Sequence, residues 1–435
     1  MILERGVVRT LDPSLPTASA LAIAADRIAG GVGTHETAMP GPERVDLGGR
    51  CVVPGFNDAH VHFPTWAVAR GEVRLEGTRS VEEAVSRVRD ALGSVQAGGW
   101  LRGRGWRSAE WPEQPTKEAL DAVAANLPVA LLAQDSHSLW LNSAALARAN
   151  GDLDVAGGVV ERDERGEPTG VLREESCWRF RDRHIEISAV EYVEAMRAGL
   201  RVAASRGVTA VHDKDGWIGA LRFWQDLSDL TLRVWQSFPA EQLDQLAELG
   251  MRSAFGSSML RAGYLKTFMD GTLGSETARL LDGSGVEITS RAELAEIVRR
   301  GAAAGWPVAV HAIGDRANRE ALDAFEETRE LWAPLGLRQR IEHAQLLAPE
   351  DVGRFAELGV AASVQFSHAP SDRDLADRFW AGKTDGAYAY RSLWESGAVV
   401  ANGSDAPIEE LDPLAGIVAG VLRTLDERPA WHAEQ

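Results

Sequence analysis

The chain has 435 residues, of which 45% are hydrophobic and 25% charged, and its formal net charge is −18. This length and this hydrophobic fraction suffice for one large barrel and a smaller domain with a substantial core. The negative charge argues against nucleic acid and anionic membranes as partners, because both bind proteins through basic surfaces. A small-molecule substrate remains the expected partner.

Export and disulfide formation are not expected either. The N-terminus, Met1–Arg5, leads into short alternating runs without a basic segment and a long apolar stretch, so we expect a cytoplasmic protein. Only Cys51 and Cys177 are present, too few for a disulfide framework, and neither has the spacing of a zinc site. We expect both cysteines to be reduced and structural.

The first 50 residues predict a small β domain. Short alternating apolar runs at 20–24 and 27–29 lie between glycine and proline turns.

Eight strand-like runs then predict an α/β fold, a (β/α)8 TIM-like barrel within residues 51–435. Several of the runs are separated by segments of helical period, for example 291–304 and 316–331. The predicted strands are Val52–Asn57, Val208–His212, Leu232–Ser237, Gly263–Thr267, Pro307–His311, Gln339–His343, Val360–Gln365 and Ala398–Gly403.

Strands 1 and 2 of this series are separated by far more residues than a crossover helix needs, which predicts an inserted subdomain or lid at 64–195. Such an enlargement at the catalytic mouth of a barrel normally builds the substrate pocket or a lid. The insertion contains six of the fourteen tryptophans, helix-like stretches at 80–92, 116–125 and 143–150, and a strand-like run at 128–133.

Two histidines one residue apart, His60 and His62, close an apolar run that begins at Val53. On an extended strand, residues i and i+2 point to the same face, so both imidazoles can reach one metal ion at the strand's end. Imidazole suits zinc and its neighbours. Taken alone, the pair is equally consistent with ordinary surface or core histidines.

Four later residues of metal-binding or modifiable type stand near the ends of predicted strands: Lys266, His311, His343 and Asp405. Catalytic groups of parallel barrels lie at the C-terminal ends of the strands, so these side chains converge in space. Singly, each histidine is more often a core residue and Asp405 more often a turn or N-cap residue. Together, in this order, they favour a metal site.

With these residues in place, the chain resembles the amidohydrolase superfamily of metal-dependent hydrolases, specifically the amidohydrolase-3 (YtcJ-like) branch that includes N-substituted formamide deformylases. The motifs are highly specific for the superfamily and silent on the substrate. The matching segments are Pro54–His62, Lys266–Thr272, Val310–Ala317, Arg340–Gln345 and Gly403–Pro407.

The resemblance implies a ligand set for one or two divalent ions, with zinc expected. His60 and His62, with Asp405 nearby, would hold the more buried metal, and His311 and His343 the second. Lys266 stands where two-metal members carry a lysine carboxylated by carbon dioxide, because a carbamate supplies anionic oxygens that an ammonium lacks. An unmodified structural Lys266 is the alternative, and it implies a single-metal site.

The resemblance also implies chemistry. Metal-activated hydroxide would attack the substrate carbonyl, with Asp405 as general acid/base. Either a metal or His137 would polarise the carbonyl oxygen, although His137 is also consistent with a surface histidine near a capped helix start. The candidate substrate-binding residues are Gln345, Gln365, Trp140 and Asp270, of which the two glutamines are also candidates for orienting metal ligands.

Two segments depart from the family pattern. Where the family often has proline after the glutamine of strand 7, this chain has Phe366-Ser367-His368, which alters that pocket wall. Nothing like the family's C-terminal glycine-rich segment follows Arg428–His432, so we expect exposed edges on the N-terminal domain and possible homo-oligomerisation.

Three functions are consistent with these features. The leading one is hydrolysis of an amide-type C–N bond in an N-substituted formamide or N-acyl compound. Deamination of a heterocycle by a single-metal site is the alternative within enzymes, and a metal-free scaffold barrel is the third.

Overall fold

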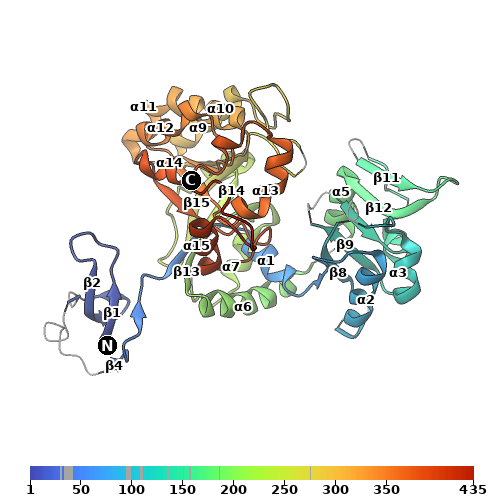
Figure 1. Cartoon of the computed structure of the whole chain (residues 1–435), viewed down its shortest axis with the longest axis horizontal. Coiled ribbons are helices and arrows are strands. Elements are labelled where there is room, and N and C mark those ends of the chain that lie inside the picture. The colour runs from blue at the N-terminus through green and yellow to red at the C-terminus, as the bar shows by residue number, and fades with distance from the viewer. Residues whose placement is uncertain are drawn as a thin grey trace.

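The structure, a computed structural model, describes residues 1–435 except 30–31, 34–42, 95–98, 108–110, 135–137, 150, 156–157, 186 and 275. The described residues form a five-stranded, a six-stranded and an eight-stranded sheet. Figure 1 shows the eight-stranded sheet and its helices in the middle of the molecule, with the other two sheets on opposite sides of it.

The eight-stranded sheet is a parallel, nearly closed barrel. Neighbouring strands pair in the order in which they follow along the chain. The backbone N–H of Asp405 donates to the carbonyl of His60 at 2.7 Å, and that of His62 to the carbonyl of Ala406 at 2.9 Å, which brings the first and last strands together. The strands are β6 Phe56–Val61, β13 Val208–Asp213, β14 Arg233–Pro239, β15 Leu260–Phe268, β16 Val308–Ala312, β17 Arg340–His343, β18 Ala361–Val364 and β19 Val400–Asn402.

The predicted first strand, Val52–Asn57, overlaps the barrel strand only at Phe56 and Asn57, whereas the other seven predictions match observed strands over at least half of their length. Its first residue belongs to β5, Cys51–Val52, in the five-stranded sheet, and the barrel strand begins only at Phe56. Pro54 has no N–H for a ladder, and a Cβ at Gly55 would lie 2.2 Å from Cγ2 of Thr209. These two residues separate the sheets.

Helices surround the barrel, and their ends follow from local chemistry. Helix α9 coincides with the prediction; it begins with a capping box between Ser290 and Glu293 and ends at Gly305, which has φ 79°. The helices are α1 Phe63–Ala69, α6 Ala189–Ser205, α7 Ala220–Gln225, α8 Leu243–Glu248, α9 Arg291–Ala304, α10 Asp315–Glu327, α11 Arg329–Trp332, α12 Pro349–Leu358, α13 His368–Phe379, α14 Tyr390–Glu395 and α15 Pro413–Leu422.

The helix predicted at 316–331 is interrupted. Helix α10 ends at Glu327, and α11 begins at Arg329. Thr328 between them turns its hydroxyl back to the carbonyl of Ala324 at 2.7 Å, a bond by which threonine competes with the helical ladder.

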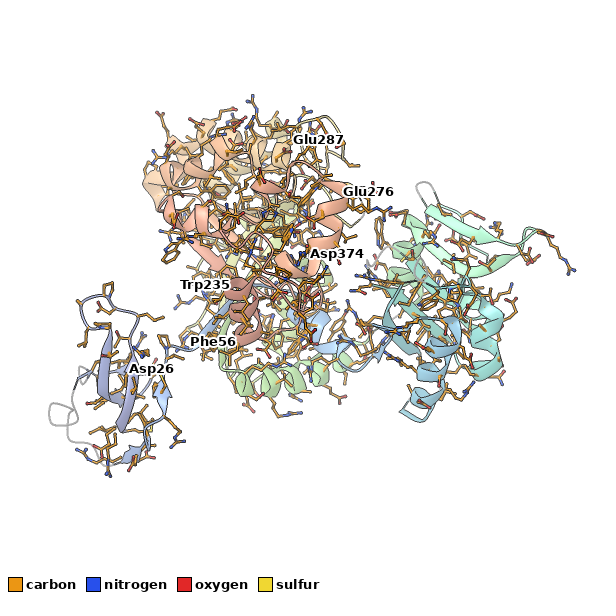
Figure 2. The ribbon with its side chains drawn as sticks, in the orientation of Figure 1. Asp26, Phe56, Trp235, Glu276, Glu287 and Asp374 are labelled. Atoms are coloured by element: carbon orange, nitrogen blue, oxygen red, sulfur yellow. The ribbon has the colours of Figure 1, made fainter. Side chains whose placement is uncertain are left out.

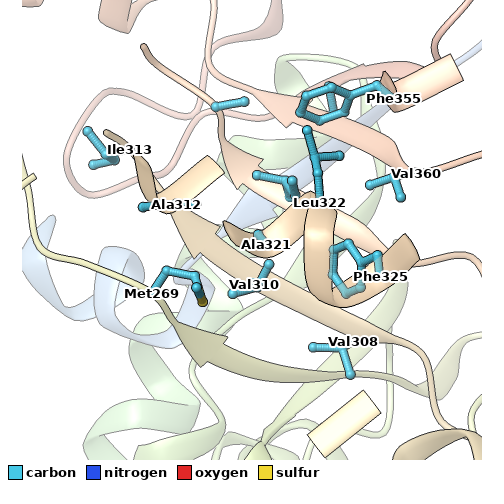
Figure 3. Close-up of a cluster of buried hydrophobic side chains, with 14 of the residues drawn as sticks. Met269, Val308, Val310, Ala312, Ile313, Ala321, Leu322, Phe325, Phe355 and Val360 are labelled. Atoms are coloured by element: carbon cyan, nitrogen blue, oxygen red, sulfur yellow. The ribbon is translucent and has the colours of Figure 1, made fainter. Parts of the chain in front are cut away.

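The largest apolar core lies between the barrel strands and these helices. Val308 and Val310 of β16 are fully buried, as are Ala321, Leu322 and Phe325 of α10. Figure 3 shows the side chains of this strand and this helix lying against one another. The packing fixes the position of β16, which ends beside the site described below.

The N-terminal sheet contains both runs predicted there. Its strands are β1 Ile2–Arg9, β2 Thr17–Ala24, β3 Arg27–Ile28, β4 Arg44–Asp46 and β5 Cys51–Val52, in the order β3-β2-β1-β4 with β5 also on β1. A cavity between this sheet and the barrel is lined by Asp26 and Arg27 on one side and by Trp235 and Arg261 on the other. Asp26 and Trp235 are labelled in Figure 2.

The six-stranded sheet is formed from residues 73–174, between β6 and β13 of the barrel. Its strands are β7 Val73–Arg74, β8 Leu101–Trp106, β9 Val129–Ala133, β10 Ser138–Leu141, β11 Gly158–Arg162 and β12 Pro168–Glu174, and its helices are α2 Val81–Ala91, α3 Lys117–Ala124, α4 Ser143–Leu146 and α5 Glu175–His184. Three of the predicted elements appear as α2, α3 and β9. The helix predicted at 143–150 is shorter, because α4 is followed by a 3₁₀ turn at Ala147–Ala149.

Cys177 is buried in an apolar cluster, as expected of a structural cysteine, whereas Cys51 is exposed and belongs to none of the apolar clusters of the described residues. Among the described residues, no helix is both long enough and apolar enough to cross a membrane.

Candidate metal centre

Four histidines and one aspartate converge at the C-terminal ends of the barrel strands. They are His60 of β6, His62 directly after it, His343 at the end of β17, His368 at the start of α13 and Asp405 after β19. The sequence predicted four of them, and His368 is the addition.

Asp405 lies between two pairs of imidazoles. Its Oδ1 is 3.4 Å from Nε2 of His60 and 3.6 Å from Nε2 of His62. Its Oδ2 is 3.8 Å from Nδ1 of His343 and 3.8 Å from Nε2 of His368. Atoms bound to a tetrahedral zinc at about 2.0–2.2 Å lie roughly 3.3–3.6 Å from one another, so the distances from Oδ1 to His60 and His62 have the spacing of a metal site.

The backbone around the cluster is held in an uncommon conformation. Asp405 has φ 56° and His343 has φ 76°, both in the left-handed region that side-chain-bearing residues rarely adopt. Such strain persists where surrounding structure imposes it, and it is typical of functional sites.

The first histidine pair is oriented by carboxylates. Nδ1 of His60 lies 2.7 Å from Oε2 of Glu342, and Nδ1 of His62 lies 2.7 Å from Oδ1 of Asp215. A histidine that donates one ring N–H to a carboxylate presents the other nitrogen as a lone pair, the arrangement found around metal ligands. Both Nε2 atoms therefore face Asp405 as potential ligands.

Glu342 is fully buried among cations. Lys214 donates to it at 3.2 Å and Arg340 at 3.0 Å. Burial opposes ionisation of this carboxyl, but the charges of Arg340 and Lys214 outweigh burial and hold its pKa well below the usual range. Burial lowers the pKa of Lys214 to about 8, against the opposing pull of Glu342. Nδ1 of His60 is therefore hydrogen-bonded to a carboxylate that stays charged.

The imidazoles of the cluster differ in protonation. Burial lowers the pKa of His62, but the carboxylates of Asp215 and Asp405 outweigh burial and raise the pKa overall. Burial lowers the pKa of His60 and His343 well below the usual range, and neutral imidazole is the form that binds metals. Burial also raises the pKa of Asp405, although the nearby His368 and His62 lower it.

Lys266 is 2% exposed and lies near this cluster. Its amine donates to the carbonyl of Thr267 at 3.3 Å and lies 3.8 Å from the ring centroid of Phe268. Burial lowers its pKa to about 7, with Glu342 opposing and Lys214 adding to the shift. The neutral form of the amine is therefore accessible near neutral pH.

His311 lies beside His343, with ring centroids 4.5 Å apart, but faces a different group. Its Nε2 is 2.9 Å from the carbonyl of Gly271 and 3.7 Å from Oδ1 of Asp270. Burial and the charge of Lys266 lower its pKa to about 3.

The other predicted residues divide into two groups. Gln345 and Gln365 are at the cluster: Oε1 of Gln365 is 2.9 Å from Nδ1 of His343, and Nε2 of Gln345 is 3.1 Å from Nδ1 of His368. Trp140 is fully buried in the core of the six-stranded sheet instead.

The carboxylate of Asp270 accepts hydrogen bonds from backbone N–H groups rather than facing the cluster. It accepts N–H groups from Arg279 at 2.8 Å, Ile313 at 3.0 Å and Gly314 at 2.8 Å. His137 lies outside the described residues.

Sequence reasoning missed the groups that orient the ligands. Asp215 and Lys214 follow β13 directly, and a charged run after a predicted barrel strand was the signal that could have found them. Glu342 was within a recognised motif but was given no role. His368 had only its position just after strand 7 to indicate it.

The cluster also contains buried polar atoms without hydrogen-bond partners in the part of the chain that the structure describes. They are Oε1 of Gln345, Nε2 of Gln365 and Nε2 of His368. Buried polar groups are normally paired, so these atoms indicate a position built for a ligand. The donor set of imidazoles and a carboxylate fits a divalent metal of the zinc type.

Comparisons with known proteins agree with this chemistry. A sequence model of the amidohydrolase family matches residues 43–431. YtcJ of Bacillus subtilis, which is named as an amidohydrolase, is 29% identical over 92% of this chain and 79% of its own length. The N-substituted formamide deformylase of Arthrobacter pascens is 27% identical over 96% of this chain and 82% of its own length.

A solved structure shares the fold along nearly the whole chain. The crystal structure of an uncharacterized metal-dependent hydrolase from Pyrococcus horikoshii matches with a TM-score of 0.82 and 29% identity. The match covers 97% of this chain and 86% of that one.

Proposed function

This chain belongs to the amidohydrolase family of metal-dependent hydrolases, in its YtcJ-like branch, and from that premise we propose that it hydrolyses an amide-type C–N bond in a small molecule. The observation that carries the proposal is the position of Asp405, whose two oxygens each face two imidazole groups at 3.4 to 3.8 Å. His60 and His62, together with this carboxylate, can hold a catalytic ion.

Zinc is the proposed metal, held by His60, His62 and Asp405. Such an ion lowers the pKa of water from about 15.7 towards about 7 and polarises a carbonyl oxygen. Asp405 accepts the proton of the water and returns it to the leaving amine, a role that needs hydrogen-bond reach of both atoms. Glu342 and Asp215 accept hydrogen bonds at the two Nδ1 atoms and so keep the Nε2 atoms pointed at the ion.

Carboxylation of Lys266 is proposed as a further source of ligand oxygens. A neutral amine is the form that reacts with carbon dioxide, and burial makes this form available at neutral pH by lowering the pKa to about 7. The carbamate replaces a buried cation with an anion beside the metal position. Substitution of Lys266 by alanine then lowers the metal content measured in bicarbonate buffer.

An N-substituted formamide or N-acyl compound is the proposed substrate class. The similarity to the Arthrobacter pascens deformylase points in this direction. Oε1 of Gln345 and Nε2 of Gln365 have no hydrogen-bond partner among the described residues. They offer one acceptor and one donor, which complement the N–H and C=O of an amide.

The test is an assay of amine release from a panel of N-substituted formamides and N-acyl amines, with the zinc-loaded wild type and Asp405→Asn. We expect the variant to lose about 10²- to 10⁴-fold in rate, because it cannot transfer the proton. Asp385→Asn, which removes an exposed carboxylate outside the cluster, is the matched control and keeps the wild-type rate.

Two results contradict the proposal. Ammonia release from heterocyclic bases, with the amide panel untouched, establishes the single-metal deaminase alternative. A wild-type protein that binds no metal in elemental analysis establishes the scaffold alternative.

A further inference from the structure

We propose that two carboxylates beside the candidate metal centre, Asp372 and Glu409, bind a positively charged group of the substrate. The enzyme then favours N-formyl or N-acyl amines whose amine portion carries a second, cationic amino group. The inference rests on the proposed function and narrows its substrate class. It also disfavours N-acyl amino acids, because their carboxylate meets two like charges.

Two neighbouring segments bring this acidic pair together at the barrel rim. Asp372 lies in α13, four residues after His368, so the two side chains lie on the same face of the helix, one turn apart. Glu409 lies four residues after Asp405, in the segment after β19. Its carboxylate accepts a hydrogen bond from the side chain of Ser371, the residue before Asp372.

The ring of His368 connects the acidic pair with Asp405. Burial raises the pKa of Asp372, Glu409 and Asp405, and the nearby His368 lowers it in each case, so its ring lies within electrostatic reach of all three. Nε2 of His368 is 3.8 Å from Oδ2 of Asp405. This nitrogen is buried and has no hydrogen-bond partner among the described residues. Buried polar atoms are normally paired, so the nitrogen indicates a ligand position that reaches from Asp405 to the acidic pair.

The acidic pair lacks a matching cation. Among the described residues, Asp372 accepts a hydrogen bond from the hydroxyl of Tyr388 at 2.8 Å, and Glu409 one from Ser371, but neither makes a salt bridge with a lysine or an arginine. Arg107, on the inserted segment, also opposes the effect of burial on Asp372 and lowers its pKa. Carboxylates taken out of water without a paired charge are costly, and an ammonium group placed between the two removes that cost.

Asp372 is held in place by Tyr388. The ring of Tyr388 is fully buried, its N–H donates to the carbonyl of Gln345 at 2.6 Å, and its carbonyl accepts from the guanidinium of Arg423 at 3.2 Å. Tyr388 has φ 52°, in the left-handed region, a conformation that surrounding structure must impose. The carboxylate of Asp372 is therefore positioned before a ligand arrives, which lowers the entropy cost of binding.

The position of the pair determines which part of the substrate carries the charge. The amide must reach Asp405, while the cationic group reaches Asp372 and Glu409 on either side of the ring of His368. A formyl group has no substituent that could carry a charge, so in a formamide the charge lies on the amine portion. Water adds to the formyl carbon, the C–N bond breaks, and the products are formate and a diamine that takes up the proton.

The experiment compares charged and neutral substrates of the same shape. The substrates are mono-N-formyl diamines from ethylenediamine to cadaverine, each with an isostere in which methyl replaces the ammonium group, and kcat/KM is measured with the zinc-loaded protein. For the best-fitting length we expect wild type to favour the cationic substrate about 10- to 100-fold, the range of a hydrogen bond to a charged group.

Asp372→Asn keeps the size of the side chain and an acceptor for Tyr388 but removes the charge. We expect the ratio of kcat/KM for the cationic and neutral substrates to fall about 10-fold or more. Asp374→Asn is the matched control, because this residue of the same helix has a side chain that is 74% exposed and paired with Arg428 at 2.6 Å (Figure 2). It keeps the wild-type ratio.

Glu409→Gln is the second variant, and it keeps the inference testable should Asp372→Asn not fold. We expect the same fall in the ratio, together with about 10-fold weaker binding of cadaverine in a calorimetric titration, a readout that needs no turnover.

The outcomes separate this inference from the proposed function. If wild type hydrolyses the cationic and neutral substrates equally well at every length, the cation site is overturned and the proposed function stands. A cationic preference that survives in both Asp372→Asn and Glu409→Gln overturns the assignment to these residues. If none of the amides is hydrolysed, the proposed function itself is overturned, and the inference with it.

Discussion

Two buried clusters of large side chains, at the barrel rim and in the six-stranded sheet, differ in how their polar atoms are satisfied. In the sheet, Nε1 of Trp140 donates to the carbonyl of Thr116 at 2.9 Å, and Nε1 of Trp106 to that of Leu131 at 2.7 Å. At the rim, buried nitrogens and oxygens of His368, Gln345 and Gln365 have no such partners among the described residues.

The comparison teaches that burial alone does not indicate a site. Trp140 is fully buried and His60 is 1% exposed, yet one belongs to a closed core and the other to an open set of ligands. Buried polar atoms without partners among the described residues also occur elsewhere, for example at Trp66 and Asn318, but at the rim they belong to His368 and to the two glutamines that contact histidine rings. Four measurements test this distinction between the two clusters.

The largest expected effect is on stability, in the six-stranded sheet. Trp140→Ala removes a ring that packs against Trp106 and Trp111, with centroid distances of 6.2 and 6.0 Å. We expect a loss of about 3–5 kcal/mol in the free energy of unfolding, measured with urea. Zinc bound per folded chain stays unchanged. Trp394→Ala, at a ring position that is 70% exposed, is the control and stays within about 0.5 kcal/mol. A loss of zinc in Trp140→Ala would place this residue in the site.

The second expected effect is the stabilisation of the folded chain by zinc bound at the barrel rim. Free zinc at 100 times its dissociation constant stabilises the folded chain by about 2.7 kcal/mol, because the ion binds only the folded cluster. Thermal unfolding with zinc and with chelator measures this difference. In His60→Ala the difference shrinks, and an unchanged difference there would show that zinc stabilises the protein from elsewhere.

The third expected effect is on zinc affinity, through the carboxylates that hydrogen-bond to the candidate ligand histidines. Asp215→Asn keeps the shape of the side chain but weakens its bond to Nδ1 of His62, now 2.7 Å long. We expect zinc affinity to fall about 10- to 100-fold, measured by competition with a chromophoric chelator. Asp226→Asn removes an exposed carboxylate next in the chain and serves as control. Equal affinities in the two variants would contradict an orienting role for Asp215.

The last expected effect is a pH dependence at Asp270, a buried carboxyl that accepts three backbone N–H groups. Burial raises its pKa to about 7, against the backbone N–H groups that lower it. The folded protein therefore holds a proton that the unfolded chain releases near pH 4, and this contribution to stability falls as pH rises from about 4 to about 7.

The slope is at most about 1.4 kcal/mol per pH unit for one proton. Urea unfolding of metal-free wild type and Asp270→Asn at pH 5 and pH 7 measures the part that belongs to this residue. A difference between the two proteins that does not change with pH would show that the carboxyl titrates normally.

The sequence predicted the barrel and most of the cluster because both follow from short-range patterns. His60, His62, His343 and Asp405 stand at the ends of apolar runs, and a parallel barrel gathers such ends at one rim. The predicted helix 291–304 likewise had a serine and a glutamate in capping positions.

The other features of the fold and the site depended on contacts between residues that are far apart in the sequence. The first strand was misplaced because its inward-facing residues are polar: Asp58 looks like a loop residue, yet it accepts backbone N–H groups from His60 at 3.1 Å and Ser404 at 3.0 Å. Gln345 and His368 lie in separate segments, after β17 and after β18, and their contact is not visible in the sequence. Trp140 was assigned to the site through the resemblance to the family, whereas its ring lies in the core of the six-stranded sheet.

The backbone contact between β6 and the segment after β19 has a consequence for the synthesis of the protein. The carbonyl of His60 is bonded to the N–H of Asp405, so the two ends of the barrel meet through residues of the metal centre. A chain emerging from the ribosome carries His60 and His62 long before Asp405 is synthesised. The centre can therefore be loaded only after Asp405 has been synthesised and has paired with the first barrel strand.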